Sequence, residues 1–140
     1  KIGRDLDLAL PPVNVDPEQM KRVLINLVDN ALDALDGEGE IVLKTRYLKE
    51  REVVALEVVD TGPGISVADR ERLFLPYFST KRGGTGLGLA IVHRIIAEHA
   101  GQIQIEDNVP KGTRVIIELP ALTPVSDNGS GVGPWPTTRS

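Results

Sequence analysis

The chain has 140 residues, which is enough for one domain with a hydrophobic core but not for two. Its formal net charge of -4 gives no basic surface for nucleic acid, and its lack of cysteine excludes disulfides, thiolate metal sites and cysteine nucleophiles. No apolar run is long enough to cross a membrane and the N-terminus does not resemble a signal peptide, so we expect a cytoplasmic domain, even if the full-length protein is membrane-anchored elsewhere.

A short strand is the first element that the sequence predicts. Leu6, Leu8 and Leu10 alternate with charged or small residues, and Pro11 and Pro12 are expected to end the strand. The residues before this strand are interpreted as a segment that arrives from something upstream.

A long amphipathic helix is predicted over residues 16–35. Asp16 is expected at the N-cap, Pro17 at the first helical position and Gln19 at the third, so that Asp16 and Gln19 close the first turn from both sides. Apolar side chains recur at helical spacing and predict one buried face, made of Met20, Val23, Leu24, Leu27, Val28, Ala31, Leu32 and Leu35.

The same helix carries two amides outside its apolar face. Asn26 and Asn30 lie one turn apart with Asp33 in the same row, so their side chains are expected to converge beside the core. Amide oxygens are ligands for hard cations and leave room for the water and phosphate oxygens that Mg²⁺ prefers. Taken alone, this helix fits a magnesium site and a solvated polar stripe about equally.

The rest of the chain predicts two hairpins, two further helices and a tail. The second long helix is apolar over most of its circumference and is expected to be largely buried. The predicted elements are strands over 41–47 and 53–60 joined by a charged loop over 49–52, a short helix over 70–74 capped by Ser66 and Asp69, a helix over 87–99 with Gly101 as its C′ residue, and strands over 102–107 and 113–119. Composition predicts a domain over residues 1–120 and a disordered tail over 121–140.

An acidic residue followed by two glycines marks the end of the predicted strand 53–60. Gly62 and Gly64 allow the backbone to approach a flat ligand closely. An ionised Asp60 accepts hydrogen bonds only, so it favours the amino group of adenine and repels the carbonyl of guanine. A tight Asp-Gly turn is the alternative, which the second glycine and the long irregular loop after it disfavour.

A glycine-rich run directly precedes the second long helix. Its members are Gly83, Gly84, Thr85, Gly86, Leu87 and Gly88. Backbone N–H groups at a helix N-terminus bind anions, so the run predicts a di- or triphosphate site. It matches neither the Walker loop nor the dinucleotide-binding spacing, which disfavours NAD. A flexible linker is the alternative, but linkers seldom lead straight into an apolar helix.

Most aromatic residues of the chain lie between these two motifs. Phe74, Tyr77 and Phe78 are expected to anchor a cover over the site to the core. Lys81 is expected to meet a terminal phosphate as a point charge, with a solvated loop lysine as the more common alternative.

Four motifs, taken in order, resemble the boxes of sensor histidine kinases. Asn26–Ala31 resembles the N box, Asp60–Gly64 the G1 box, Phe74–Phe78 the F box and Gly84–Leu89 the G2 box. The resemblance spans about residues 5–120, and within the family the chain looks like the nitrogen-regulation sensor kinases. It implies the α+β Bergerat fold, a two-layer α/β sandwich in which helices cover one face of a mixed, mostly antiparallel sheet and ATP lies under a lid.

The resemblance also implies a set of site residues, with ATP and Mg²⁺ as cofactors. Asn30 is the implied magnesium ligand, Asp60 reads adenine, Thr113 supports the adenine pocket, and Asn26 and Lys81 are the implied catalytic residues. The nucleotide-binding residues are expected to be Asn26, Asn30, Asp33, Asp60, Gly62, Gly64, Ile65, Tyr77, Lys81, Gly84, Thr85, Gly86, Leu87, Gly88 and Thr113.

Asn26 separates this chain from hydrolytic relatives. The related ATPases of the gyrase, Hsp90 and MutL type carry a glutamate at this position, where it activates water. An amide cannot take a proton at neutral pH, so hydrolysis is expected to be slow. Phosphoryl transfer needs chiefly alignment and charge neutralisation, and the resemblance makes the nucleophile a histidine.

The acceptor histidine is expected outside this chain. His93 is followed by Arg94 rather than by an acidic residue, and His99 lies near a helix C-terminus, where it would complement the dipole, so both are interpreted as structural. The expected partners are the dimerisation and histidine phosphotransfer domain of the same protein and, indirectly, a response regulator. The fragment is expected to be monomeric and the full-length protein a homodimer. A nucleotide-sensing module without transfer and a serine kinase of the anti-sigma type remain as alternatives.

Overall fold

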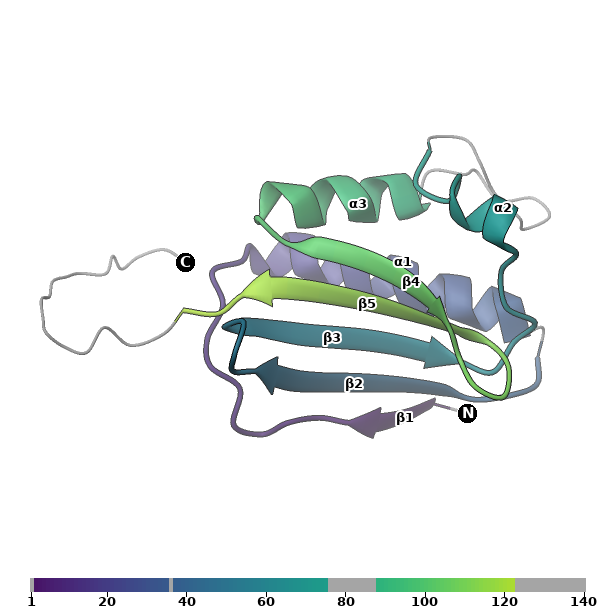
Figure 1. The fold of residues 1–140 in the computed structure, drawn as a ribbon, viewed down its shortest axis with the longest axis horizontal. Coiled ribbons are helices and arrows are strands. Elements are labelled where there is room, and N and C mark those ends of the chain that lie inside the picture. Colours follow the sequence, from purple (N-terminus) through teal and green to yellow (C-terminus); the bar gives the residue numbers. More distant parts are fainter. Residues whose placement is uncertain (1, 36, 76–87, 123–140) are drawn as a thin grey trace, which may run out of the picture.

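A five-stranded sheet with helices against one face forms the described part of the chain (Figure 1). The structure is a computed structural model that describes residues 2–35, 37–75 and 88–122. The elements are β1 (Ile2–Asp5), α1 (Pro17–Leu35), β2 (Ile41–Leu48), β3 (Val53–Asp60), α2 (Val67–Arg70), α3 (Gly88–Glu98), β4 (Gln102–Asp107) and β5 (Thr113–Pro120). The strand order is β1-β2-β3-β5-β4, with β1 parallel to β2 and the other neighbours antiparallel. The expected α+β sandwich with a mixed, mostly antiparallel sheet is therefore confirmed.

The core lies between the sheet and the α1–α3 layer. Alternate residues of the central strands point at the helices, because side chains of a strand alternate between its two faces. The buried residues that pack together there are Val23, Leu27, Ala31, Ile41, Val58, Val92, Ile95, Ile96, Ile117 and Leu119. Leu32, which was expected in this set, is 44% exposed, because it lies at the outer margin of the apolar face of α1. α3 buries one face only, so the expectation of a largely buried helix is wrong.

The N-cap of α1 is the predicted Asp16, but the predicted contact from Gln19 back to Asp16 is not made. The Asp16 side chain accepts hydrogen bonds from the backbone N–H groups of Glu18 at 2.9 Å and Gln19 at 3.4 Å. The N–H of Asp16 itself donates to Nε2 of His99 at 3.0 Å, not to the Gln19 side chain, so the reciprocal half of the predicted cap is wrong. A residue from the end of α3 has taken that role.

His99 makes this link in its neutral form. Its Nε2 accepts from Asp16, and its Nδ1 lies 2.7 Å from the carbonyl oxygen of Ile95, to which it can donate. A ring that accepts at one nitrogen and donates at the other carries one proton. His99 therefore joins the end of α3 to the start of α1, which is a structural role as expected.

α3 ends in a Schellman motif that lies one residue earlier than expected. Ala100 has φ of +61° and its N–H donates to the carbonyl of Ala97, which makes Ala100 the C′ residue. The N–H of Gly101 donates to the carbonyl of Ile96, so Gly101 is C″. Glycine is needed there for space, because a Cβ would lie 2.6 Å from the carbonyl oxygen of Glu118.

The first strand lies before the alternating leucines, so the strand predicted over residues 6–10 is wrong. β1 runs beside β2 with Ile2 opposite Ile41, and the chain leaves the sheet after Asp5. The Leu8 side chain is 97% exposed, and the N–H of Asp7 donates to the Thr45 side chain. Alternating apolar residues do not form a strand where no neighbouring strand provides backbone groups for hydrogen bonds.

The short helix also lies earlier than predicted. Ser66 is its N-cap as expected and accepts from the N–H of Asp69, but the helix is Val67–Arg70, and residues 71–74 continue as turns. At the other end of the domain, Ala121 and Leu122 still form backbone hydrogen bonds, to Glu52 and Pro12. These two residues belong with the fold, two positions beyond the expected boundary, while 123–140 lie outside the described residues.

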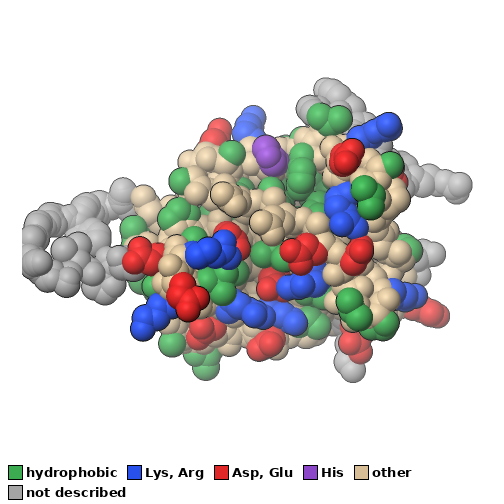
Figure 2. Space-filling model, in the orientation of Figure 1, with side chains coloured by type: hydrophobic (Ala, Val, Ile, Leu, Met, Phe, Trp, Pro, Cys, Tyr) green, Lys and Arg blue, Asp and Glu red, His purple; other side chains and the backbone are tan. Residues whose placement is uncertain are grey.

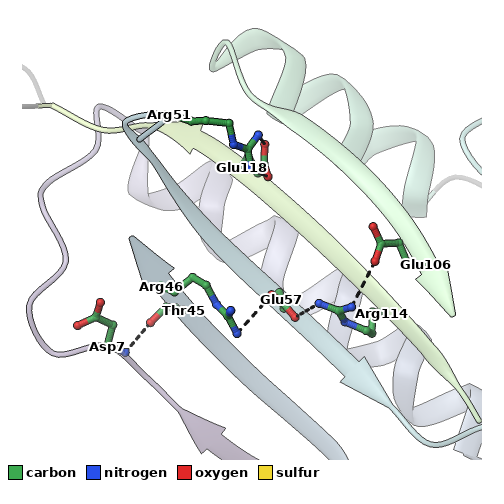
Figure 3. A network of polar contacts seen from close by, with 8 residues as sticks. All are labelled: Asp7, Thr45, Arg46, Arg51, Glu57, Glu106, Arg114 and Glu118. Carbon is green, nitrogen blue, oxygen red and sulfur yellow. Dashed lines mark hydrogen bonds and ion pairs between the residues drawn. The ribbon is translucent and has the colours of Figure 1, made fainter. Parts of the chain in front are cut away.

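The opposite face of the sheet is closed by charged side chains, as Figure 2 shows from that side. Glu57 is 4% exposed and pairs with Arg114 at 2.9 Å and with Arg46 at 3.9 Å, as Figure 3 shows. Arg51 makes a two-pronged contact with Glu118 at 2.9 and 2.6 Å. Arginine stems cover apolar surface while their heads stay in water, which explains how strand residues on this face are buried without a helix over them.

Two leucines of α1 provide a test of this packing. Leu27 is 2% exposed and Leu32 is 44% exposed. Leu27→Ala leaves a cavity in the core and is expected to lower the free energy of unfolding by about 3 kcal/mol. Leu32→Ala removes the same atoms from a wetter position and is expected to cost less than about 1 kcal/mol. Urea unfolding of both variants measures this difference, and equal losses would contradict the assigned face.

Candidate functional site

Asp60 ends the central strand β3, and its side chain is buried at the point where three strands meet. It lies in register with Thr113 at the start of β5 and with Ile41 at the start of β2. Its Oδ1 accepts the N–H of Gly62 at 2.9 Å, and the backbone N–H of Thr113 is a second donor to the carboxylate. The predicted position of Asp60 at a strand end is confirmed, and Thr113 supports it through the backbone.

Burial determines the protonation chemistry of this carboxylate. Loss of water around Asp60 raises the pKa of its carboxyl above the ordinary value, while the hydrogen bonds from Gly62 and Thr113 act in the opposite direction. The backbone N–H groups of Gly62 and Thr113 thus favour the ionised form of the buried Asp60 carboxylate, which accepts hydrogen bonds only. A ligand with an amino group gains a strong partner there, whereas a carbonyl in the same place meets repulsion.

The loop after Asp60 lies between the end of α1 and the β4–β5 turn. A Cβ on Gly62 would lie 3.1 Å from the carbonyl oxygen of Ala34, and one on Gly112 would lie 1.9 Å from the carbonyl oxygen of Asp60. Gly112 has φ of +114° and Gly64 has φ of +85°, both in the region that favours glycine. Gly62 and Gly112 therefore allow the loop after Asp60 to pack closely against the end of α1 and the facing turn, while the approach to a flat ligand expected from Gly62 and Gly64 stays a prediction.

Asn108 is a positioning residue that the sequence analysis did not single out. Its side-chain amide donates to the carbonyl oxygens of Asp60 and Lys111, each at 3.1 Å, and its backbone N–H donates to Gly112. Asparagine in a turn before glycine often bonds local backbone in this way, so the Asn108–Gly112 turn carried a usable signal. No local sequence signal predicts the hydrogen bond to the carbonyl of Asp60, which lies 48 residues away.

The amide row of α1 reaches the start of α3. The Asn26 side chain lies 3.9 Å from the position that a Cβ on Gly88 would occupy, so the N-terminus of α3 stands beside it. Asn30, one turn further, is half-buried, and Asp33 is exposed. Ala34 follows at the next turn and contacts Gly62. One side of α1 therefore runs from the start of α3 to the loop after Asp60.

Part of the predicted site lies outside the described residues. These positions are Tyr77, Lys81, Gly84, Thr85, Gly86 and Leu87. Among the aromatics of the predicted cover, Phe74 is described, and its ring packs on His93 with a centroid distance of 5.2 Å. Ile65 is described as well, and its carbonyl accepts a hydrogen bond from Arg70.

The described residues contain no cluster of three or more His, Cys, Asp or Glu side chains that would hold a metal ion. The predicted magnesium ligand is an amide oxygen, Asn30, which suits a cation that keeps water and phosphate oxygens around it. A cleft of 630 Å³ between the start of α1 and the end of α3 lies elsewhere and contains none of the predicted site residues. The candidate site is instead the surface formed by α1, the loop after Asp60 and the start of α3.

Comparison with known families identifies the class of protein. Residues 15–123 match the model of the histidine kinase-, DNA gyrase B- and HSP90-like ATPases. The chain belongs to this ATPase family. Among its curated relatives it is 40% identical over 112 residues to the sensor histidine kinase ZraS of Escherichia coli O157:H7, and 42% identical over 129 residues to the sensory histidine kinase/phosphatase NtrB of Salmonella typhimurium.

These matches cover 80% and 86% of the chain but 24% and 37% of ZraS and NtrB, so the chain spans well under half the length of the relatives. Solved structures agree. The nucleotide-free catalytic domain of the histidine kinase ThkA matches with a TM-score of 0.77 at 37% identity, covering 86% of this chain and 78% of that one. Full-length ShkA in complex with AMPPNP matches with a TM-score of 0.78 at 28% identity, covering 90% and 26%. The chain is a histidine kinase-type ATPase catalytic domain, and the nitrogen-regulation type stays a prediction because ZraS is about as similar as NtrB.

No helix in the parts of the chain that the structure describes combines the length and the hydropathy of a membrane span.

Asp60 is expected to make the stability of the nucleotide-free domain depend on pH. Because its pKa is raised in the folded state, the folded protein binds more protons between the unfolded and folded pKa values, and the free energy of unfolding falls as pH rises through that interval. The stability of the wild type minus that of Asp60→Asn should therefore decrease from about pH 4 upward and then level off. Urea unfolding across this range measures it.

Asp29→Asn, at an exposed position of α1, is the matched control for the same chemical change. A stability difference between the wild type and Asp60→Asn that rises with pH would contradict the effect of burial.

Proposed function

We propose that this domain binds ATP together with Mg²⁺ and transfers the γ-phosphoryl group to a histidine on the dimerisation and phosphoacceptor domain of the same protein, for relay to a response regulator. The observation that carries the proposal is the buried Asp60 carboxylate, held by backbone N–H groups at a strand end within a domain of this ATPase family. ATP binding follows from the family, and the roles of single residues are proposed here.

Adenine is assigned to the Asp60 end of the site. Its exocyclic amino group is proposed to donate to the carboxylate, and the loop carries no side chain at Gly62 and Gly64 that would keep a flat ring from its backbone. Guanine is disfavoured, because its carbonyl would face a group that only accepts. Thr113 supports the pocket by fixing Asp60 from β5.

The phosphates are assigned to the other end, beside α1 and the start of α3. Asn30 is the proposed magnesium ligand, with Asp33 nearby on the helix, and Mg²⁺ held there would neutralise phosphate charge. The N-terminal N–H groups of α3, from Gly88 onward, favour an anion in front of them. Tyr77, Lys81 and the run Gly84–Leu87 keep the nucleotide-binding roles that the family pattern assigns to them. Support for nucleotide binding in general comes from ShkA, whose solved structure is a complex with AMPPNP.

Asn26 favours transfer over hydrolysis. An amide cannot accept the proton of an attacking water, so water at this place gains no general base. A neutral imidazole needs no base to attack, because its nitrogen already carries a lone pair. That nitrogen would bond to the γ-phosphorus while the bond to the bridging oxygen breaks and ADP leaves, and the remaining N–H proton would pass to solvent. Alignment by the domain then accounts for most of the rate.

The partner assignment rests on relatives. The chain matches ThkA in complex with the response regulator TrrA at a TM-score of 0.73 and 33% identity, covering 87% of this chain and 34% of that one. The phosphoacceptor domain is proposed to precede this domain in the full-length protein, which would be a homodimer with this domain on the cytoplasmic side of any membrane.

Phosphoryl transfer is tested by adding a separately produced dimerisation and phosphoacceptor domain of the full-length protein. With γ-labelled ATP and Mg²⁺, acid-labile label should appear on the added domain, because phosphohistidine is acid-labile, while this chain stays unlabelled. Replacing the acceptor histidine with glutamine is the control and should abolish labelling. Tight nucleotide binding without transfer would instead support a nucleotide-sensing module, and stable label on His93 would contradict the assignment.

The metal assignment is tested with two asparagine variants. Asn30→Ala is expected to weaken Mg-ATP binding by about tenfold or more, while affinity for ATP in excess EDTA changes little, because the proposed role of the amide oxygen is to bind the metal rather than the nucleotide. Asn14→Ala, at an exposed position three residues before α1, is the matched control and should leave both affinities unchanged. Calorimetry measures the four values. An equal loss with and without Mg²⁺ would remove Asn30 from the metal.

A further inference from the structure

Arg70 connects three segments that are far apart in the sequence. Its Nη2 donates to the carbonyl oxygen of Ile65 at 3.1 Å and to Oδ1 of Asp107 at 2.6 Å. The first bond holds the end of the loop after Asp60, and the second reaches the last residue of β4. One nitrogen thus ties this loop and α2 to the edge of the sheet.

The attachment point belongs to the strand ends that hold Asp60. Asp107 lies in register with Thr113, and Thr113 lies in register with Asp60. The next residue, Asn108, donates to the Asp60 carbonyl. Arg70 therefore holds the far end of the loop against the same strand ends that fix its near end.

α2 has little else to hold it. None of its four residues is buried, so hydrophobic packing does not set its position. The next buried side chain is Leu73, beyond its end. Polar ties must therefore orient the helix, and among the described residues Arg70 makes the ties that reach the sheet.

The arginine is not optimised for stability. Its Nε is buried without a hydrogen-bond partner in the described structure, and an unpaired buried donor costs free energy. Its ion-pair partner is 73% exposed, a setting in which salt bridges contribute little to folding. A residue that costs stability in this way, placed beside the loop that faces the ligand, points to a functional role.

We propose that Arg70 and Asp107 form a latch that holds the loop over residues 61–66 in its nucleotide-binding conformation, so that Arg70 is a positioning residue for ATP. This rests on the proposed function, since the loop is the one assigned to adenine. The latch acts through the loop backbone and touches no part of the nucleotide itself.

The latch predicts a graded loss of nucleotide affinity. Arg70→Gln should weaken binding of ATP and ADP alike, by about fivefold, because the loop must be ordered at the expense of binding energy. Arg70→Lys should stay within about twofold of wild type, because both bonds come from one nitrogen that an ammonium can replace. Asp107→Asn should lose about threefold, since the bond to Ile65 remains. Calorimetry with each nucleotide gives these ratios.

A double-mutant cycle shows whether the two residues act together. If Asp107 acts through Arg70, Asp107→Asn adds no further loss to Arg70→Gln. Arg94→Gln is the matched control, because it breaks the exposed Arg94–Glu98 pair at 4.0 Å on α3 with the same change of charge. Its affinity should equal wild type.

Hydrogen exchange of the nucleotide-free protein separates the latch from a general loss of stability and from the proposed function. Arg70→Gln should speed exchange of the amides in 61–66 while core strand amides keep their rates. Wild-type affinity and exchange in Arg70→Gln would overturn the latch, as would a uniform rise in exchange over all strands. If wild type bound no ATP, the proposed function would fail, and the exchange result would still report on the latch.

Discussion

A carboxylate buried at the end of the central strand is the constraint on which the site depends. Asp60 loses most of its hydration there, and this disfavours the ionised carboxylate, which is the form that accepts a hydrogen bond from a ligand amino group. Two backbone N–H groups, from Gly62 and Thr113, offset part of that cost. Their positions require a tight loop and a close facing turn, which is why Gly112 stands where no Cβ fits. The hydrogen-bond acceptor of the site is thus one carboxylate that surrounding backbone groups hold in place.

The architecture leaves the strand ends as the natural place for chemistry. One face of the sheet is covered by α1 and α3 and is apolar, while the other is closed by arginine and glutamate side chains that pair with one another. Neither layer offers a place for a polar ligand. The chain leaves the sheet at the end of β3, and the β4–β5 turn leads into β5 beside that point. Two loops therefore converge there and can supply backbone groups that are not committed to strand pairing.

The shorter of the two long helices, α3, contacts α1 at both of its ends. At one end His99 of the α3 terminus caps Asp16 at the start of α1, and at the other Asn26 of α1 lies against Gly88 at the start of α3. On its core-facing side α1 buries Val23, Leu27 and Ala31. A single helix thus carries the core on one face and the amide row on another, and the fixed pairing with α3 holds that row beside a helix N-terminus.

Much of the fold could be predicted from the sequence because the residues that determine each helix or strand are close together in the chain. The N-cap at Asp16, the spacing of apolar residues in α1, the valine-rich run of β3 and the alternation in β4 are each encoded in neighbouring residues, and the structure has these elements at almost the predicted bounds. In the candidate site, Asp60 with Gly62 and Gly64 was predictable for the same reason, because a strand end and glycine turns are written in one short segment. Asn26 and Asn30 were found by helical spacing.

The tertiary structure decided which group meets which. Leu6, Leu8 and Leu10 alternate as a strand would, but β1 formed earlier because that is where β2 offers its edge. The N–H of Asp16 donates to a histidine 83 residues later instead of to Gln19. Arg70 pairs with Asp107, which lies 37 residues further along the chain. The sequence by itself determined the order of elements and the types of residue that can bind a nucleotide, since propensity and periodicity act over a few residues. Only the folded chain decided the partners of Asp60, Asp16 and Arg70, because hydrogen bonds between distant segments depend on how the layers pack.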